Sequence, residues 1–294
     1  MTPTAISALR ARVGESACWS VRDQSLFSVD IWSRELWRHD ADHQPARFAM
    51  PEMAACVVPA DEGVLVALES HLLAGNPDQG AWRRVDAPAD HPDTHRFNDA
   101  CVAPDQSLVI GTMHKSHLGA SPTGTLYRLA QGRWSVLATG FWTINGLAFS
   151  PDGCWLYLSD SHPEVQMVWR APWDGGAIGP RQVFARFDSL RGRPDGATVD
   201  ARGNYWIAGV GGGCVHCFDA EGVHVAEIDM PVENPTRVAV GGPALDRLYV
   251  TSMAERLTRP DPAGLAGAVL MIDGVAGGIA TPFCVMRDGA APGG

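Results

Sequence analysis

The chain has 294 residues, of which 46% are hydrophobic, and a formal net charge of −10. A nucleic-acid partner would require a clustered basic face, so this excess of acid argues against one. No segment approaches the roughly 20 apolar residues of a membrane span, and the N-terminus lacks the basic and apolar regions of a secretory signal, so we expect a cytoplasmic protein with no membrane partner.

A strand, a turn and a second strand recur six times along the chain. In the first copy, Glu15 opens a strand that passes through a turn near Asp23 into residues 26–31. The second strands of the six copies begin near Leu26, Val64, Leu108, Leu156, Tyr205 and Leu248. The steps between these positions are 38, 44, 48, 49 and 43 residues, close to the roughly 40 to 50 residues of a four-stranded propeller blade. Further short strands are expected at residues 35–38, 124–128, 167–170, 213–217 and 269–272.

This repetition predicts an all-β fold, a six-bladed β-propeller with four-stranded blades around a central channel. A single domain would span residues 1–294. A β-sandwich or two small barrels would not require six comparable hairpins. At the ends of the chain, residues 4–12 resemble a short, locally helical lead-in, although a brief apolar run can equally be a strand, and residues 289–294 resemble a frayed tail.

The seven cysteines are irregularly spaced. Cys18, Cys56 and Cys101 recur at one register of the repeat, as small buried hydrophobic residues would. Cys214 and Cys217 suggest a redox or zinc pair, but positions three apart on a strand face opposite sides. We therefore expect unpaired core thiols in a reducing compartment.

Four side chains with oxygen atoms occupy one register of the repeat. The inner strands of a propeller meet around its channel, so equivalent positions should meet there. At the start of the first strand of each copy the chain offers Glu15, Met53, Asn98, Asn145, Asp195 and Pro235. Two carboxylates in a narrow channel repel each other unless a cation lies between them. Alternatively, the asparagines cap turns and the acids end strands in water, and the periodicity leaves both interpretations open.

Arg96 stands two residues before Asn98 and so lies on the same face of an extended segment. A guanidinium group and an amide on one face can bind the hydroxyl groups and ring oxygen of a polar ligand. The alternative is an ion pair between Arg96 and Asp99 or another surface acid.

Several separate motifs together resemble the gluconolactonase, regucalcin and senescence-marker-protein family. The resemblance covers roughly residues 14–253 and keeps the order of the motifs. The matching segments are Gly14-Glu15-Ser16, residues 26–31, Arg96-Phe97-Asn98-Asp99-Ala100, Gly111-Thr112-Met113, residues 145–153 and Pro194-Asp195-Gly196. The resemblance implies a propeller with one divalent metal ion near its axis, used to open sugar lactones to sugar acids.

The resemblance also implies roles for five side chains. Glu15, Asn145 and Asp195 match the three metal ligands of the family, and Arg96 and Asn98 match the positions that hold the substrate. Asp195 is in addition our candidate general base, because a carboxylate can bridge a metal ion and a water molecule. Oxygen ligands suit calcium, magnesium or manganese, and they also accept zinc or ferrous iron. The expected small-molecule partner is a sugar lactone.

Other functions remain open, namely a calcium- or ligand-binding propeller without catalysis, or an esterase of another class on the same fold. Arg96 and Asn98 favour a lactonase, because a pure metal binder has no need of a substrate grip beside its site. Some relatives place a glutamate in the loop before Gly124, whereas residues 118–123 contain none, so the substrate pocket should differ. His114 is a candidate contact at the rim of that pocket. Two histidines such as His114 and His117 are more often part of a solvated loop than of a second metal site.

Overall fold

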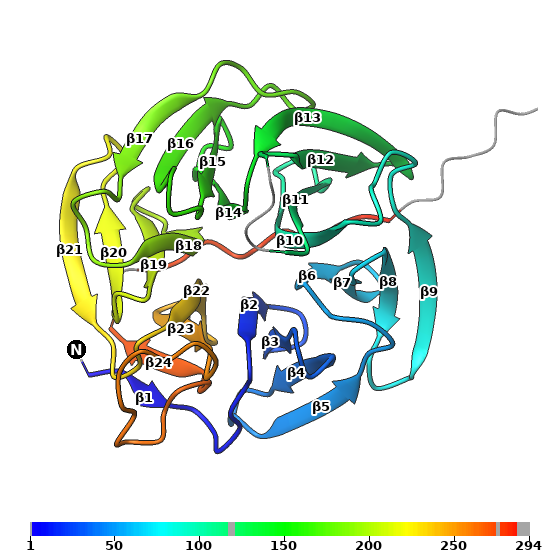
Figure 1. Ribbon diagram of the computed structural model, residues 1–294. Helices are drawn as coiled ribbons and strands as arrows, with labels where there is room; N and C mark the ends of the chain where they lie inside the picture. The colour runs from blue at the N-terminus through cyan, green and yellow to red at the C-terminus, as the bar shows by residue number, and fades with distance from the viewer. Residues whose placement is uncertain (1, 117–120, 275–276, 287–294) are drawn as a thin grey trace, which may run out of the picture.

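The computed structural model describes residues 2–116, 121–274 and 277–286, which form 24 β-strands. The strands make six four-stranded sheets arranged in a ring (Figure 1). The predicted six-bladed β-propeller is therefore confirmed. The described residues contain no helix, and so none that is long and apolar enough to cross a membrane. The tail predicted at residues 289–294 lies outside the described residues.

Each sheet is one blade, with its first strand beside the channel and its outermost strand at the rim (Figure 1). Blade 1 comprises β2 (Gly14–Ser20), β3 (Ser25–Asp30), β4 (Glu35–His39) and β5 (Pro45–Ala49). Blade 2 comprises β6 (Cys56–Ala60), β7 (Gly63–Ala67), β8 (His71–Asn76) and β9 (Ala81–Asp86). Blade 3 comprises β10 (His95–Val102), β11 (Leu108–His114), β12 (Gly124–Ala130) and β13 (Arg133–Phe141).

The other three blades follow the same plan. Blade 4 comprises β14 (Ile144–Phe149), β15 (Trp155–Asp160), β16 (Met167–Pro172) and β17 (Gln182–Arg186). Blade 5 comprises β18 (Arg193–Val199), β19 (Tyr205–Val210), β20 (Cys214–Phe218) and β21 (His224–Asp229). Blade 6 comprises β22 (Pro235–Gly241), β23 (Arg247–Ser252), β24 (Leu270–Asp273) and, from the other end of the chain, β1 (Thr4–Ala5).

Blade 6 is closed by the N-terminal segment. β1 pairs with β24, with Thr4 opposite Met271, and the backbone N–H of Ala11 donates to the Gly267 carbonyl at 2.8 Å. The prediction of a helical lead-in at residues 4–12 is therefore wrong. The edge of β24 offers backbone groups that pair with this segment, and such pairing outweighs a weak local helical preference. The N-terminal segment thus closes the ring by completing the blade that β22, β23 and β24 form.

The apolar core forms six layers, one between each pair of neighbouring blades. In the layer between blades 6 and 1, Trp19 and Tyr249 are buried and stack with ring centroids 5.9 Å apart and planes 2° apart. Large stacked aromatic rings stabilise a seam through buried area and through their own attraction. These layers fix the inner strands around the channel, where the candidate site lies.

Five inner strands carry a β-bulge near the end of the channel at which they begin, and the site residues lie at these bulges. A bulge takes the side chain at its start out of the regular alternation and can aim it in a new direction. The register shifts fall between Glu15 and Cys18, Phe97 and Ala100, Asn145 and Ala148, Pro194 and Ala197, and Pro235 and Val238. The sequence register therefore corresponds to one repeated backbone distortion at one end of the channel.

The last described segment, residues 277–286, crosses the centre of the ring (Figure 1). Gly278 bridges to Asp200 at the end of blade 5's inner strand, and Cys284 bridges to Ala60 in blade 2. Both partners lie where inner strands end rather than where they begin. The segment therefore covers the end of the channel opposite to the bulges.

Candidate active site

A cavity of about 120 Å³ opens at the end of the channel where the inner strands begin. It is lined by all five predicted site residues, which are Glu15, Arg96, Asn98, Asn145 and Asp195. They come from the inner strands of blades 1, 3, 4 and 5. The ring thus brings together residues that are far apart in the sequence.

The backbone turns sharply after Glu15 and after Asn145. Ser16 has a φ of 56° and Gly146 a φ of 64°, both in the left-handed region. At Gly146 a Cβ atom would lie 2.4 Å from the hydroxyl oxygen of Tyr205, which donates to the Gly146 carbonyl at 2.8 Å. Only glycine fits both the conformation and the space, so Gly146 permits the turn that directs Asn145 into the cavity.

A chain of hydrogen bonds crosses the cavity wall from blade 3 to blade 5. Arg96 Nη1 donates to Asn98 Oδ1 at 2.8 Å, and Asn98 Nδ2 donates to Asn145 Oδ1 at 2.8 Å. Asn145 Nδ2 donates to Ser161 Oγ at 2.6 Å, and the Ser161 hydroxyl donates to the Pro194 carbonyl at 2.5 Å. Because that carbonyl takes the only proton of the hydroxyl, Ser161 must accept from the amide nitrogen of Asn145. The amide is thereby oriented with its oxygen toward Asn98, and this oxygen keeps a lone pair for a cation.

Glu15 and Asp195 are buried carboxyl groups. Burial, with a smaller contribution from the Asp99 carboxylate, raises the pKa of Glu15 to about 7, although the Ser16 N–H donates to Glu15 Oε2 at 2.8 Å. Burial and the nearby charge of Glu15 raise the pKa of Asp195 well above its ordinary value. Burial thus disfavours the ionised form of both acids, and a cation bound between them would stabilise that form.

Arg96 does not pair with Asp99. Asp99 forms a buried ion pair with Arg237 and accepts a hydrogen bond from the Leu147 N–H at 2.9 Å. Burial lowers the pKa of Arg96 to about 10, which leaves the guanidinium charged at neutral pH. None of the ion pairs within residues 2–116, 121–274 and 277–286 includes Arg96. The interpretation of Arg96 as part of a salt bridge is therefore wrong, and its charge faces the cavity beside Asn98.

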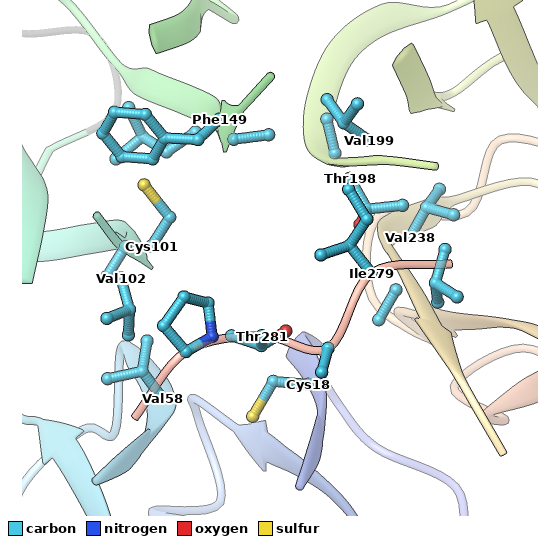
Figure 2. Close-up of a pocket in the computed structure, with 18 of the residues that line it drawn as sticks. Cys18, Val58, Cys101, Val102, Phe149, Thr198, Val199, Val238, Ile279 and Thr281 are labelled. Carbon is cyan, nitrogen blue, oxygen red and sulfur yellow. The ribbon is translucent and has the colours of Figure 1, made fainter. Parts of the chain in front are cut away.

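A larger cavity of about 240 Å³ lies at the opposite end of the channel. Its wall consists mainly of aliphatic side chains and thiols, including Val58, Val199, Cys18 and Cys101, with Ile279 on the segment that crosses it (Figure 2). Burial raises the pKa of Cys18 to about 12, so its thiol stays protonated at neutral pH. Such a wall offers apolar contact rather than a set of oxygen ligands, so the smaller cavity is the candidate site.

The cysteines are all free, as predicted, but Cys154 is exposed and is therefore not a core thiol. Cys214 Sγ lies 3.3 Å from His216 Nε2, and with Glu227 these residues form a second group of potential metal ligands. However, Arg191 already pairs with Glu227 at 2.7 Å, and His216 Nε2 lies 2.9 Å from the Arg191 carbonyl oxygen. Protein partners therefore satisfy this group without an ion. Cys217 packs apart from it, in the core layer between blades 5 and 6.

Sequence reasoning missed several side chains of the candidate site. Arg193 had a usable signal, because it stands two residues before Asp195 just as Arg96 stands two residues before Asn98. Residues in the connecting loops lack any periodic signal. The further lining residues include Trp32, Thr143, Ser161, His162, Arg193, Thr236 and Arg256.

His114 does not line this cavity, although its neighbour Met113 does. The imidazole turns instead toward Ser116, whose backbone N–H donates to His114 Nδ1 at 3.1 Å. His117 and most of the following loop, residues 118–120, lie outside the described residues.

A family model described as SMP-30/Gluconolactonase/LRE-like region matches residues 13–254. A pentonolactonase of Haloferax volcanii is 34% identical over 266 residues, which cover 86% of this chain and 85% of that protein. A 6-deoxy-6-sulfogluconolactonase of Pseudomonas putida is 37% identical over 268 residues, which cover 87% of this chain and 89% of that protein. Among solved structures, the calcium-binding protein regucalcin of Agrobacterium tumefaciens is similar with a TM-score of 0.87 and 27% identity, covering 95% of this chain and 96% of that one.

Proposed function

Because the chain belongs to the SMP-30/gluconolactonase/LRE-like family, we propose that it hydrolyses a sugar lactone to the corresponding sugar acid with the help of one divalent metal ion. The observation that carries this proposal is the convergence of Glu15, Asn145 and Asp195 in a cavity that also contains Arg96 and Asn98. The lactonases among its relatives support a lactone as the substrate class.

The donor set fits a hard divalent cation. Two carboxyl groups and one amide oxygen are ligands that calcium, magnesium and manganese prefer and that zinc and ferrous iron accept. The raised pKa values of Glu15 and Asp195 indicate that the protein alone compensates their charge poorly. The hydrogen bond from Asn145 Nδ2 to Ser161 leaves the amide oxygen as the ligand atom. A relative that is named as calcium-binding adds support for a cation here.

In the proposed mechanism, the residues of the chain bind the lactone, orient it and move one proton. When bound, a divalent cation supplies a Lewis acid that polarises the ring carbonyl. Asp195 takes the proton of the attacking water, a task suited to a carboxylate whose pKa is raised above its ordinary value, and returns it to the ring oxygen as the bond between that oxygen and the carbonyl carbon breaks. Arg96 and Asn98 hold the hydroxyl groups and ring oxygen, so that the carbonyl is presented to the water near Asp195.

A second candidate function is calcium or ligand binding without catalysis, and the similarity to a calcium-binding regucalcin favours it. In that case the cavity would need its oxygen ligands but not the substrate contacts proposed for Arg96 and Asn98. An esterase of another class would keep the metal ligands and accept open-chain esters. The three functions therefore predict different substrate ranges for the same cavity.

The test is hydrolysis of a panel of aldonolactones by metal-stripped protein, followed as acid release. Calcium, magnesium, manganese, zinc and ferrous iron are added back separately, and an open-chain ester serves as the comparison substrate. Activity restored by a metal on one or two lactones would support the proposal and identify both partners. Tight metal binding with no hydrolysis would support the non-catalytic propeller, and a preference for the open-chain ester would support the esterase.

A further inference from the structure

Two inner strands present the same arrangement of an arginine and a polar residue to the candidate site. Arg96 and Asn98 are two positions apart in β10, and Arg193 and Asp195 are two positions apart in β18. All four residues line the cavity. Arg193 is half-buried, and its Nη1 donates to the Ser161 carbonyl at 3.2 Å. Blades 3 and 5 thus each contribute a guanidinium group.

A third guanidinium group reaches the cavity from the loop after β23. The Cζ atom of Arg256 lies 5.7 Å from the centroid of the Trp32 ring, and both residues line the cavity. Arg256 has a φ of 58°, in a region that costs a non-glycine residue about 1 kcal/mol or more. The loop and the indole therefore hold this cation at the rim.

Neither Arg193 nor Arg256 forms a direct ion pair with an acid of the described chain, although the charge of Arg193 lowers the pKa of Asp195. The ion pairs formed within the described ranges include neither residue. Arg12, whose Cζ lies 5.2 Å from the same Trp32 ring, does have a partner, because it pairs with Glu255 at 2.8 Å. Arg193 and Arg256 thus line the cavity, as Arg96 does, without a carboxylate partner among the described residues.

The charges of the cavity do not balance without a further anion. Its acids are Glu15 and Asp195, and a divalent cation between them would balance both. Arg96 is assigned to the lactone's hydroxyl groups, and Asp195, the acid that feels the charge of Arg193, is assigned to the cation, so Arg193 and Arg256 remain free to bind an anion. A partly desolvated guanidinium gains most from a carboxylate, sulfonate or phosphate, whose oxygens accept two parallel hydrogen bonds.

We propose that Arg193 and Arg256 select a sugar lactone that carries an oxyanion group, a carboxylate, sulfonate or phosphate, away from the ring carbonyl. This inference rests on the proposed lactonase function and names its substrate class. An uncharged lactone would displace water from the two guanidinium groups and return no anion, which lowers its transition-state stabilisation relative to the charged substrate.

The test uses matched lactones and metal-replete protein. Glucono-1,4-lactone is compared with glucaro-1,4-lactone, which carries a carboxylate, and glucono-1,5-lactone with its 6-phospho and 6-deoxy-6-sulfo forms. We expect kcat/KM for at least one charged lactone to exceed that of its neutral partner about tenfold or more, because hydrogen bonds to charged groups contribute about that factor. The advantage should shrink as the salt concentration rises.

Variants connect this preference to the two arginines. Arg193→Gln and Arg256→Gln should each lower the charged-to-neutral ratio of kcat/KM about tenfold, whereas Arg193→Lys, which keeps the charge, should keep part of the ratio. Arg133→Gln, at an exposed position of the outermost strand of blade 3, is the matched control and should leave the ratio unchanged.

The outcomes separate this inference from the function on which it rests. The best charged substrate identifies the oxyanion. A preference for neutral lactones would overturn the role of Arg193 and Arg256 without contradicting the proposed lactonase function. Variants that lower kcat/KM for charged and neutral lactones by the same factor would have the same meaning. Absence of hydrolysis of every lactone by the unaltered protein would overturn the proposed function and this inference with it. If Arg193→Gln fails to fold, the exposed Arg256 still provides the test.

Discussion

Asn98 donates a hydrogen bond from Nδ2 to Oδ1 of Asn145 at 2.8 Å, across the seam between blades 3 and 4. Asn98 is the proposed substrate contact and Asn145 the proposed metal ligand, so one bond joins the two halves of the site. Asn98 Nδ2 also donates to the Ile144 carbonyl at 2.9 Å, which fixes the amide from a second direction. We therefore expect metal binding at Asn145 to be coupled to the position of the Asn98 side chain.

Ser161→Ala tests whether the orientation of the Asn145 amide matters for metal binding. The change removes the acceptor of Asn145 Nδ2, so the amide can rotate and present nitrogen instead of oxygen to the cation. Loss of a group that orients a ligand typically weakens metal binding about tenfold or more. Calorimetric titration of metal-stripped protein measures the affinity. The exposed Ser135→Ala is the control, and equal affinities in the two variants would contradict the predicted role of Ser161.

Asp195→Ala and Arg96→Ala should separate metal-dependent chemistry from substrate binding. We expect Asp195→Ala to weaken metal binding and, with metal in excess, to lower kcat by about 100-fold or more, because it removes the proposed base. We expect Arg96→Ala to raise KM and to leave metal affinity close to that of the unaltered protein. Steady-state kinetics and metal titration on both variants provide the comparison. Near-normal hydrolysis by metal-replete Asp195→Ala would remove Asp195 from the mechanism.

Metal binding should depend on pH through Glu15. Its pKa of about 7, raised mainly by burial, means that the metal-free protein holds a proton on Glu15 at pH 6 and has lost it at pH 8. A cation must displace that proton, so metal affinity should rise by up to about tenfold per pH unit between pH 6 and 7, and Asp195, whose pKa is also raised, adds to this rise where it holds a proton. Titration in buffers of different ionisation enthalpy counts the protons released. The same affinity and proton count at pH 6 and pH 8 would be inconsistent with a protonated Glu15.

The blades and the ligand register could be predicted because both follow a repeat. The second strands, such as β3 and β19, are buried at every position, and ring geometry brings equivalent positions such as Glu15 and Asn145 to one cavity. The outermost strands gave no signal, since β21 is exposed at every position except Ile228. β1 could be given only as an alternative to a helix, because two residues become a strand only when the edge of β24 is present.

Within the site, the sequence indicated residue types but not their partners. Asp99 follows Asn98 directly, yet its partner is Arg237, which comes from blade 6 across the channel. No spacing rule reveals the pair between Asp99 and Arg237. Because this pair occupies Asp99, Arg96 is left to face the cavity. Arg256 was invisible because a loop has no period, and its position depends on contact with Trp32.

Gly146→Ala should destabilise the protein through both conformation and contact. An alanine with a φ of 64° costs about 1 kcal/mol, and its Cβ would lie 2.4 Å from the Tyr205 hydroxyl oxygen, which adds about 1–3 kcal/mol of overpacking. Gly140→Ala is a matched control, because Gly140 also has a positive φ, 85°, but no atom lies within 4 Å of the added Cβ. Urea unfolding of both variants measures the difference. Equal losses would mean that the contact with Tyr205 relaxes at no cost.

His39 should make the closed ring sensitive to acid. This residue at the end of β4 is buried, and its Nε2 lies 3.0 Å from Ser7 Oγ in the N-terminal segment that follows β1. Burial, with a smaller contribution from His43, lowers the pKa of His39 to about 4. An unfolded chain protonates histidine near pH 6.5, so between pH 6.5 and 4 the unfolded state binds the extra proton. The contribution of His39 to the free energy of unfolding is therefore complete above pH 6.5 and is lost as the pH falls toward 4, by up to about 3 kcal/mol.

His39→Phe replaces the buried imidazole with an apolar ring that cannot be protonated. We expect the free energy of unfolding of the variant to fall less between pH 7.5 and pH 5 than that of the unaltered protein, by about 1–2 kcal/mol. Urea unfolding of both proteins at the two pH values, with the same metal content, measures this difference, and the other titrating groups cancel because both proteins share them. Parallel losses in the two proteins would show that His39 is not the group through which acid opens the seam between β4 and the N-terminal segment.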